Sequence, residues 1–127
     1  MNGARDNRDY KKRGLSASSD GRGIKVGATG TPGTLIHTAP NNIASGEWDE
    51  VTLRVVNTSG SAVKLTIEWG GTSSPDDLIE KTIPAEDGFT EVIPGHVLQN
   101  GKEVRAFAAT ADVLVLHGFV NRYGNTP

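Results

Sequence analysis

Residues 63–69 read VKLTIEW, and this stretch decides the fold class. Apolar and polar side chains alternate along it without a break. The apolar positions are Val63, Leu65, Ile67 and Trp69, and the polar positions are Lys64, Thr66 and Glu68. A period of two is the pattern of a β-strand with one buried face. We therefore predict a strand over 63–69, with Trp69 on its core-facing side.

Short segments of the same kind recur before and after this strand, separated by Gly, Pro and Asn-Gly turn signals. The predicted strands lie within 23–28, 33–39, 50–57, 63–69, 78–83, 89–93, 102–109 and 113–122. About eight short strands with a turn every 8–12 residues or so, and no helical period, predict a single all-β domain. The expected architecture is an antiparallel β-sandwich of jelly-roll or immunoglobulin-like type.

The last predicted strand, 113–122, is apolar on both faces over Val113–Leu116. A strand with two apolar faces is usually central in its sheet, or it contacts another subunit. We therefore expect one of these two positions for it.

The composition narrows the class of protein. The chain has 127 residues, 16 of them Gly, and no Cys, which excludes disulfides and thiolate metal sites. Its longest apolar runs are about four residues, too short to span a membrane. The basic residues near the N-terminus are not followed by an apolar segment, as they would be in a secretory signal. We expect synthesis in the cytoplasm and no membrane partner.

The N-terminal stretch MNGARDNRDYKKRGLSASSDGRG, residues 1–23, differs from the rest of the chain. It carries a net charge of +3, whereas the remaining residues carry −5. Ser, Gly and charged residues without an apolar period are typical of flexible segments. We predict a flexible basic arm over 1–23 and a β-sandwich domain over 24–127. The arm residues predicted to bind a partner are Arg5, Arg8, Tyr10, Lys11, Lys12, Arg13 and Arg22.

No set of residues has the spacing of a catalytic or metal site. The three histidines, His37, His96 and His117, do not form an HxH or HxxxH pair. Acidic residues gather in three predicted loops and could offer oxygen ligands to calcium, but they lack EF-hand spacing. These acids are Glu47, Asp49 and Glu50, then Asp76 and Asp77, then Glu86 and Asp87. We predict no enzyme activity, no metal and no cofactor.

Two aromatic residues are candidates for ligand binding. Trp48 stands between two acids and is expected to be exposed, and Tyr123 follows the last predicted strand. Exposed aromatic rings would suit a carbohydrate or another small ligand. The basic arm could neutralise phosphates, but Tyr10 is its single aromatic and Asp6 and Asp9 dilute its charge. Nucleic-acid binding is therefore not expected.

Two segments carry a resemblance to a known group of proteins. They are VNTSGSAVKLTIEWGG, residues 56–71, and TIPAEDGFTEVIPGHVLQNGKEVRAFAATADVLVLHGFVNR, residues 82–122. Together with the pattern over 24–122, they resemble the small β-sandwich structural proteins of tailed-phage virions. The resemblance implies a location in the virion and a role in capsid decoration, as a head fibre, or at the neck or tail. It implies major capsid or other virion proteins as partners.

We expect a non-enzymatic virion protein that forms a homo-oligomer and is anchored to the particle by its N-terminal arm. Extended arms can attach subunits to a repeating surface through many weak contacts. Two alternatives stay open. One is a free β-sandwich module that binds carbohydrate or another ligand, and the other is a structural protein that contacts nucleic acid through the basic arm.

Overall fold

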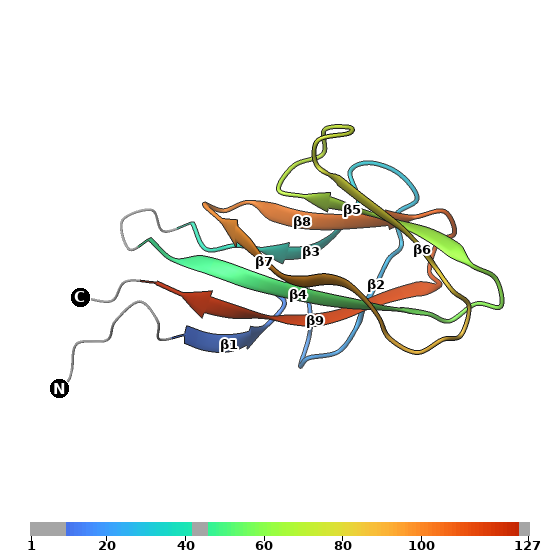
Figure 1. Ribbon diagram of the computed structural model, residues 1–127, viewed down its shortest axis with the longest axis horizontal. Helices are drawn as coiled ribbons and strands as arrows, with labels where there is room; N and C mark the ends of the chain where they lie inside the picture. Colours follow the sequence, from blue (N-terminus) through green and yellow to red (C-terminus); the bar gives the residue numbers. More distant parts are fainter. Residues whose placement is uncertain (1–9, 42–45, 125–127) are drawn as a thin grey trace.

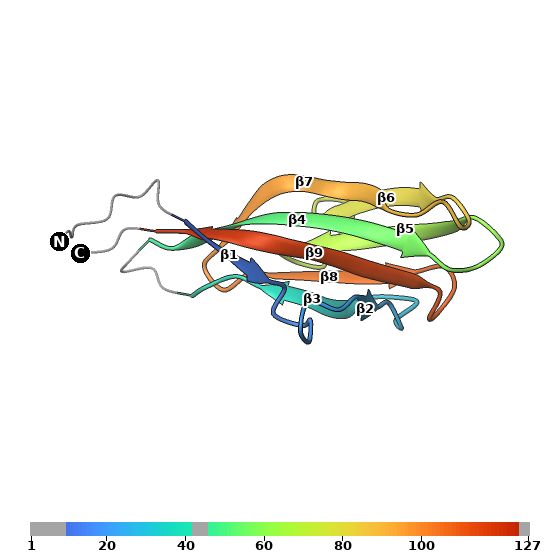
Figure 2. The ribbon, with the colours of Figure 1, turned by 90° about the horizontal axis from the view of Figure 1, so that it is seen from below.

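The computed structural model describes residues 10–41 and 46–124. Within these residues the chain forms nine β-strands and no helix (Figure 1). The strands are β1 Tyr10–Gly14, β2 Ile24–Lys25, β3 Thr34–Thr38, β4 Trp48–Asn57, β5 Val63–Trp69, β6 Leu78–Ile83, β7 Thr90–Gln99, β8 Glu103–Ala108 and β9 Leu114–Tyr123. They build two antiparallel sheets that pack face to face (Figure 2). The predicted β-sandwich is confirmed.

The strand order identifies the type of sandwich. One sheet has the order β1-β9-β4-β7, with β2 also paired to β9, and the other has the order β3-β8-β5-β6. If β1 and β2 count as one interrupted strand, eight successive strands pair first with eighth, second with seventh, third with sixth and fourth with fifth. This nested pairing is the jelly-roll topology. Of the two predicted architectures, the strand order selects the jelly roll over the immunoglobulin-like fold.

The core fills the space between the two sheets. Alternate residues of β4 point inward, including Val51, Leu53 and Val55, which are fully buried. From the opposite sheet, Leu65 and Ile67 of β5 pack against them. The predicted register of 63–69 is confirmed, because Trp69 also packs against this core, although it is half-buried.

Strand β9 occupies the first of the two positions that its apolar faces predicted. It lies between β4 on one side and β1 and β2 on the other, so it is central in the five-stranded sheet. Its inward side chains Leu114, Leu116 and Val120 are buried in the core. Gly118, also inward, approaches β4 so closely that a Cβ atom there would lie 2.1 Å from the carbonyl oxygen of Thr52.

The predicted boundary between a flexible arm and the sandwich at residue 23 is wrong. Residues Tyr10–Gly14 form β1, which pairs in register with Phe119–Tyr123 of β9. Leu15 follows and is buried in the core. The amide of Ala17 then donates to the carbonyl oxygen of Ile36 in the other sheet, at 3.2 Å. Strand β1 lies at the edge of its sheet and is held by backbone pairing with β9 alone. It therefore forms without an alternation of apolar and polar side chains.

Strand β7 also differs from the prediction, which ended a strand at Ile93. The strand continues through Pro94 and Gly95 to Gln99. It pairs only with β4 and is therefore an edge strand, where a proline without an amide hydrogen is tolerated. The register shifts twice along this pair, which accommodates the irregular residues. The turn predicted at Asn100-Gly101 follows, with φ angles of 60° and 72°.

Replacing Trp69 by alanine is expected to lower the free energy of unfolding by about 3 kcal/mol, the lower end of the range for large aromatic residues, because the ring is only half-buried. Trp48→Ala serves as the comparison. Trp48 lies outside the core, and a ring pair of its kind contributes about 0.5–1.5 kcal/mol. Urea unfolding followed by circular dichroism measures both variants. Equal losses would contradict the assignment of Trp69 to the core.

Candidate functional site

The outward side of the five-stranded sheet combines aromatic, valine and charged side chains on adjacent strands. We call it the outer face, and define it by the outward side chains of its two central strands. On β4 these are Trp48, Glu50, Thr52, Arg54 and Val56, and on β9 they are Val115, His117, Phe119, Asn121 and Tyr123. In a sandwich the outward positions are normally polar. Six of these ten are aromatic, histidine or valine side chains, which is unusual for a solvated face.

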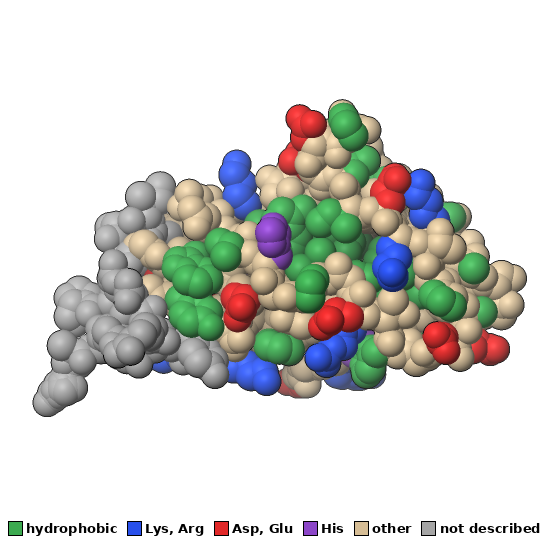
Figure 3. Space-filling view, viewed as in Figure 1, with side chains coloured by type: hydrophobic (Ala, Val, Ile, Leu, Met, Phe, Trp, Pro, Cys, Tyr) green, Lys and Arg blue, Asp and Glu red, His purple; other side chains and the backbone are tan. Residues whose placement is uncertain are grey.

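Two further apolar side chains border the outer face and are largely exposed. Val97 of β7 lies beside Glu50 and is 47% exposed, and Phe89, just before β7, is 59% exposed. The Phe89 ring reaches the ring of His117 on β9, at a centroid distance of 5.1 Å, so it lies over the outer face. Figure 3 shows hydrophobic side chains in several groups on the side that faces the viewer of Figure 1, with acidic and basic side chains between them. Exposed apolar groups concentrated on one face are typical of an interaction surface.

The two aromatic residues singled out in the sequence meet at one end of the outer face. Trp48 of β4 and Tyr123 of β9 are register partners, and their rings stack at 4.5 Å with an interplanar angle of 15°. Glu50 lies next to the stack. Its Oε1 accepts hydrogen bonds from Asn121 Nδ2 at 3.1 Å and from the Tyr123 hydroxyl at 3.4 Å. Both rings are partly buried, so the expectation of a freely exposed Trp48 is wrong.

The residues predicted to form a basic arm are distributed over the edge of the sheet. Lys11, Lys12 and Arg13 belong to β1 and are exposed. Lys12 places its Nζ 4.3 Å from the centre of the Phe119 ring, a cation–π contact with the outer face. Arg22 is exposed in the turn before β2. Tyr10 begins β1 opposite Tyr123, and Arg5 and Arg8 lie outside the described residues.

A buried polar network, which the sequence analysis missed, lies behind the Trp48–Tyr123 end of the sheet. Asp49 of β4 accepts two hydrogen bonds from Arg122 of β9, at 2.8 and 3.0 Å. Its Oδ2 also lies 2.6 Å from Nε2 of His37 in the other sheet. Asp49 is 0% and His37 1% exposed. We predicted that Asp49 lies in a loop before the strand. Strand β4 begins two residues earlier than predicted, at Trp48, and its alternation places Asp49 on the inward side.

The backbone determines the tautomer of His37. The amide of Ser16 donates to His37 Nδ1 at 2.9 Å, so this nitrogen must be unprotonated. Nε2 then carries the hydrogen and donates to Asp49. The network therefore holds a neutral histidine, a carboxylate and a guanidinium, and its charges cancel. Both ring nitrogens of His37 therefore have a hydrogen-bond partner, and Asp49 is sealed from solvent. We assign the network to stability.

The pKa of Asp49 follows from these contacts. Burial alone raises the pKa of its carboxyl group, but the hydrogen bonds from His37 and Arg122 outweigh burial and hold it below the usual range. A carboxyl pKa that is lower in the folded state stabilises the protein at any pH above the unfolded value of about 3.9, and this stabilisation disappears as the pH falls through the folded value.

We expect the melting temperature of the wild-type protein to fall on acidification below about pH 4 more steeply than that of the variant Asp49→Asn, which has no proton to gain at this position. Thermal melts between pH 7 and pH 2 measure the difference. Parallel curves for the two proteins would show that Asp49 does not contribute to the acid sensitivity.

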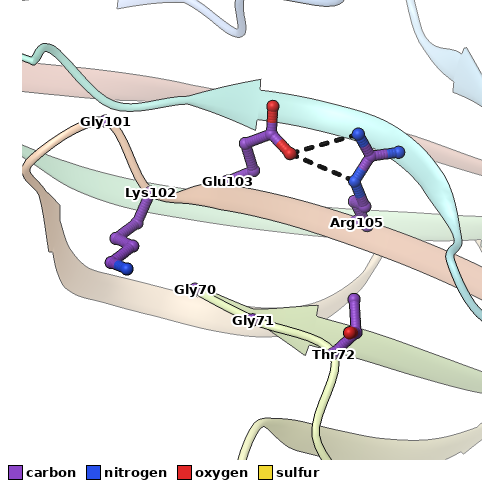
Figure 4. A pocket seen from close by; sticks show the side chains of 7 residues that line it. All are labelled: Gly70, Gly71, Thr72, Gly101, Lys102, Glu103 and Arg105. Atoms are coloured by element: carbon purple, nitrogen blue, oxygen red, sulfur yellow. Dashed lines mark hydrogen bonds and ion pairs between the residues drawn. The ribbon is translucent and has the colours of Figure 1, made fainter.

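A small pocket lies on the opposite sheet, between the loop after β5 and the turn before β8 (Figure 4). Its volume is about 180 Å³, and its lining residues are Gly70, Gly71, Thr72, Gly101, Lys102, Glu103 and Arg105. Arg105 is held by Glu103 at 3.1 Å, and its Nη1 donates to the carbonyl oxygen of Gly33 at 3.0 Å. The guanidinium is thus paired with a carboxylate and a backbone acceptor. The pocket presents both signs of charge and favours no particular class of ligand.

The loop 26–33 covers the outward side of β5 near this pocket. Glu68 accepts a hydrogen bond from the Gly33 amide at 2.7 Å and is 1% exposed, although the alternation placed it on the solvent side. Gly33 packs so closely on β8 that a Cβ atom there would lie 2.5 Å from the carbonyl oxygen of Ala106.

Within residues 10–41 and 46–124, no group of three or more His, Asp or Glu side chains is arranged to hold a metal ion. The same part of the chain contains no helix long and apolar enough to cross a membrane. No protein-family model, no curated protein and no solved structure matches the chain.

Proposed function

We propose that the protein is a non-enzymatic structural component of a tailed-phage virion, and that it docks on neighbouring proteins through the outer face. The observation that carries the docking role is the apolar character of the outer face together with the two exposed apolar side chains that border it, Phe89 at 59% and Val97 at 47% exposed. The virion role rests on the resemblance of residues 24–122 to small virion β-sandwich proteins. The jelly-roll topology supports it at the level of fold, because capsid domains commonly use it.

The composition of the outer face suits a protein partner. Tryptophan, tyrosine, phenylalanine and arginine are enriched in the parts of interfaces that contribute most to affinity. The outer face combines Trp48, Tyr123, Phe119 and Arg54 on two adjacent strands. The basic strand β1 borders it and adds a flank that suits an acidic partner surface.

Mass spectrometry of purified particles tests the virion role. Virions of the phage that encodes the chain, purified on a density gradient, are expected to contain the polypeptide in many copies. A matched preparation from which the gene has been deleted serves as the control. Absence of the polypeptide from the gradient-purified wild-type particles would contradict the proposal.

A second candidate function is binding of a carbohydrate at the Trp48–Tyr123 end of the outer face. The observation in its favour is the presence of a carboxylate, Glu50, and an amide, Asn121, beside the stacked rings. However, the stack already uses one face of each ring, which lowers the area that a sugar could cover. A glycan array probed with wild-type protein and with Trp48→Ala separates the two candidates, since a sugar-binding protein loses its signal in the variant.

A further inference from the structure

We infer that the outer face binds a second copy of this chain, with the two copies related by a two-fold axis that runs across β4 and β9 at the level of Thr52 and Phe119. These two residues are register partners at the middle of the outer face. The inference rests on the proposed docking role of the outer face and names its occupant. A two-fold interface must be self-complementary, and the residues on these two strands meet that condition.

The charged residues of β4 are placed symmetrically about Thr52. Glu50 lies two positions before it and Arg54 two positions after it, all on the outward side. When two sheets face each other across such an axis, their strand directions are reversed. Glu50 of each copy then lies at the level of Arg54 of the other copy, and this produces two opposite-charge pairs.

Both members of this pair are available for the contact. Arg54 is exposed and makes no ion pair with any residue in the described ranges, even though Glu91 is its register neighbour on β7. Glu50 is fixed in place, because its Oε1 accepts hydrogen bonds from Asn121 and Tyr123. A carboxylate held in one position loses less conformational entropy when an arginine from another chain reaches it.

The apolar residues follow the same symmetry. On β4, Trp48 and Val56 lie four positions on either side of Thr52, and on β9 Tyr123 and Val115 lie four positions on either side of Phe119. The axis therefore places the stacked rings of one copy on the two valines of the other. Phe119 is close to the axis and meets its own counterpart.

The two exposed apolar residues beside β7 fit the same arrangement. Val97 lies at the level of Glu50, and Phe89 directly precedes Thr90, which pairs with Val55 near the other end of β4. The axis brings Val97 of each copy to the level of Glu91 of the other, two residues from Phe89. The contact would thus cover both of the large apolar side chains that are exposed in the described part of the chain.

The size of the face predicts a weak dimer. Nine residues of β4 at about 3.4 Å each, across four strands about 4.8 Å apart, give roughly 600 Å² per copy. The total of roughly 1,200 Å² is at the lower limit for specific interfaces. We therefore expect a dissociation constant for the dimer in roughly the micromolar to millimolar range.

A charge-reversal experiment tests the arrangement. Sedimentation equilibrium of the full-length chain, from about 10 µM to 1 mM, is expected to show a monomer–dimer equilibrium. The variants Arg54→Glu and Glu50→Arg should each weaken dimerisation by about tenfold or more, because each places like charges together twice. The double variant should recover most of the affinity. Lys81→Glu, a charge reversal on exposed β6, is the control and should leave the equilibrium unchanged.

Two kinds of result would overturn the inference. One is a full-length chain that stays monomeric at the highest concentration, and the other is a double variant that dimerises no better than the single variants. Glu50→Arg also removes the bonds to Asn121 and Tyr123, so a thermal melt must show that it folds. If it does not, Val97→Glu replaces it, since Val97 is exposed and the variant should still weaken the dimer about tenfold.

The result is separable from the test of the virion role. A chain that is found in purified particles but is monomeric in solution would keep the proposed function and refute the inference. A dimer that responds to the charge reversals as expected, but is absent from particles, would keep the inference and refute the virion role.

Discussion

Replacing Asp49 by alanine is expected to lower the free energy of unfolding by about 3–5 kcal/mol, the cost of removing one partner from a buried ion pair. The variant leaves the Arg122 guanidinium without its carboxylate at 2.8 and 3.0 Å, and His37 Nε2 without its acceptor at 2.6 Å. Both groups lie at the end of the core, where water cannot replace all of these bonds. Urea unfolding at pH 7 measures the loss.

Asp76→Ala is the matched control for this prediction. Asp76 is an exposed aspartate in the loop before β6, and its replacement should change stability by less than about 0.5 kcal/mol. A loss for Asp49→Ala no larger than that of the control would show that the network contributes nothing. Since single-domain proteins have a total stability of about 5–15 kcal/mol, the expected loss is a large part of it.

Deleting residues 1–22 is expected to unfold most of the protein, although the composition of this segment suggested a dispensable arm. The deletion removes β1 and the buried side chain of Leu15, whose burial alone contributes about 2–3 kcal/mol. It also removes Ser16, whose amide donates to His37 and whose hydroxyl accepts from the Thr38 amide at 2.8 Å. His37 is 1% exposed, and its Nδ1 left without a partner costs about 1–3 kcal/mol.

A shorter deletion provides the comparison. Removal of residues 1–9 keeps every contact described above, so this variant should melt within about 3 °C of the full-length chain, a shift that corresponds to less than 1 kcal/mol or so. Circular dichroism at 25 °C and thermal melts distinguish the two variants. If the chain without residues 1–22 keeps a cooperative melt near the wild-type temperature, β1 and Leu15 are not part of the stable fold.

The alternation of apolar residues predicted most of the architecture correctly. It located β3, β4, β5, β6, β8 and β9 to within a few residues, because each of these strands buries one face and so follows a period of two. For β9 it left two positions open, central in the sheet or in contact with another subunit, and the strand order shows that β9 is central. The strand that it missed, β1, has no apolar alternation, because it lies at an edge and is held by backbone pairing with β9.

Only part of the candidate site could be predicted from the sequence. Trp48 and Tyr123 could be singled out as aromatic residues near polar ones, but their positions in the chain did not indicate that they stack. The stretch Val113–Leu116, apolar on both faces, was a signal of contact with another subunit, and its Val115 is one of the ten residues of the outer face. The alternation of β4 extends back from Glu50 to Asp49, which places Asp49 on the same side as Val51 and Leu53 and so predicts a buried charge.

By itself, the sequence determined that the chain is an all-β sandwich, since the period of two and the turn residues act locally and need no knowledge of distant partners. Only the tertiary structure decided the jelly-roll order, the insertion of residues 10–17 into the fold, and the meeting of His37, Asp49 and Arg122. These three residues come from β3, β4 and β9. Their contact depends on how the two sheets pack and in which register the strands pair, and pairing between distant segments leaves no mark on the local pattern of either strand.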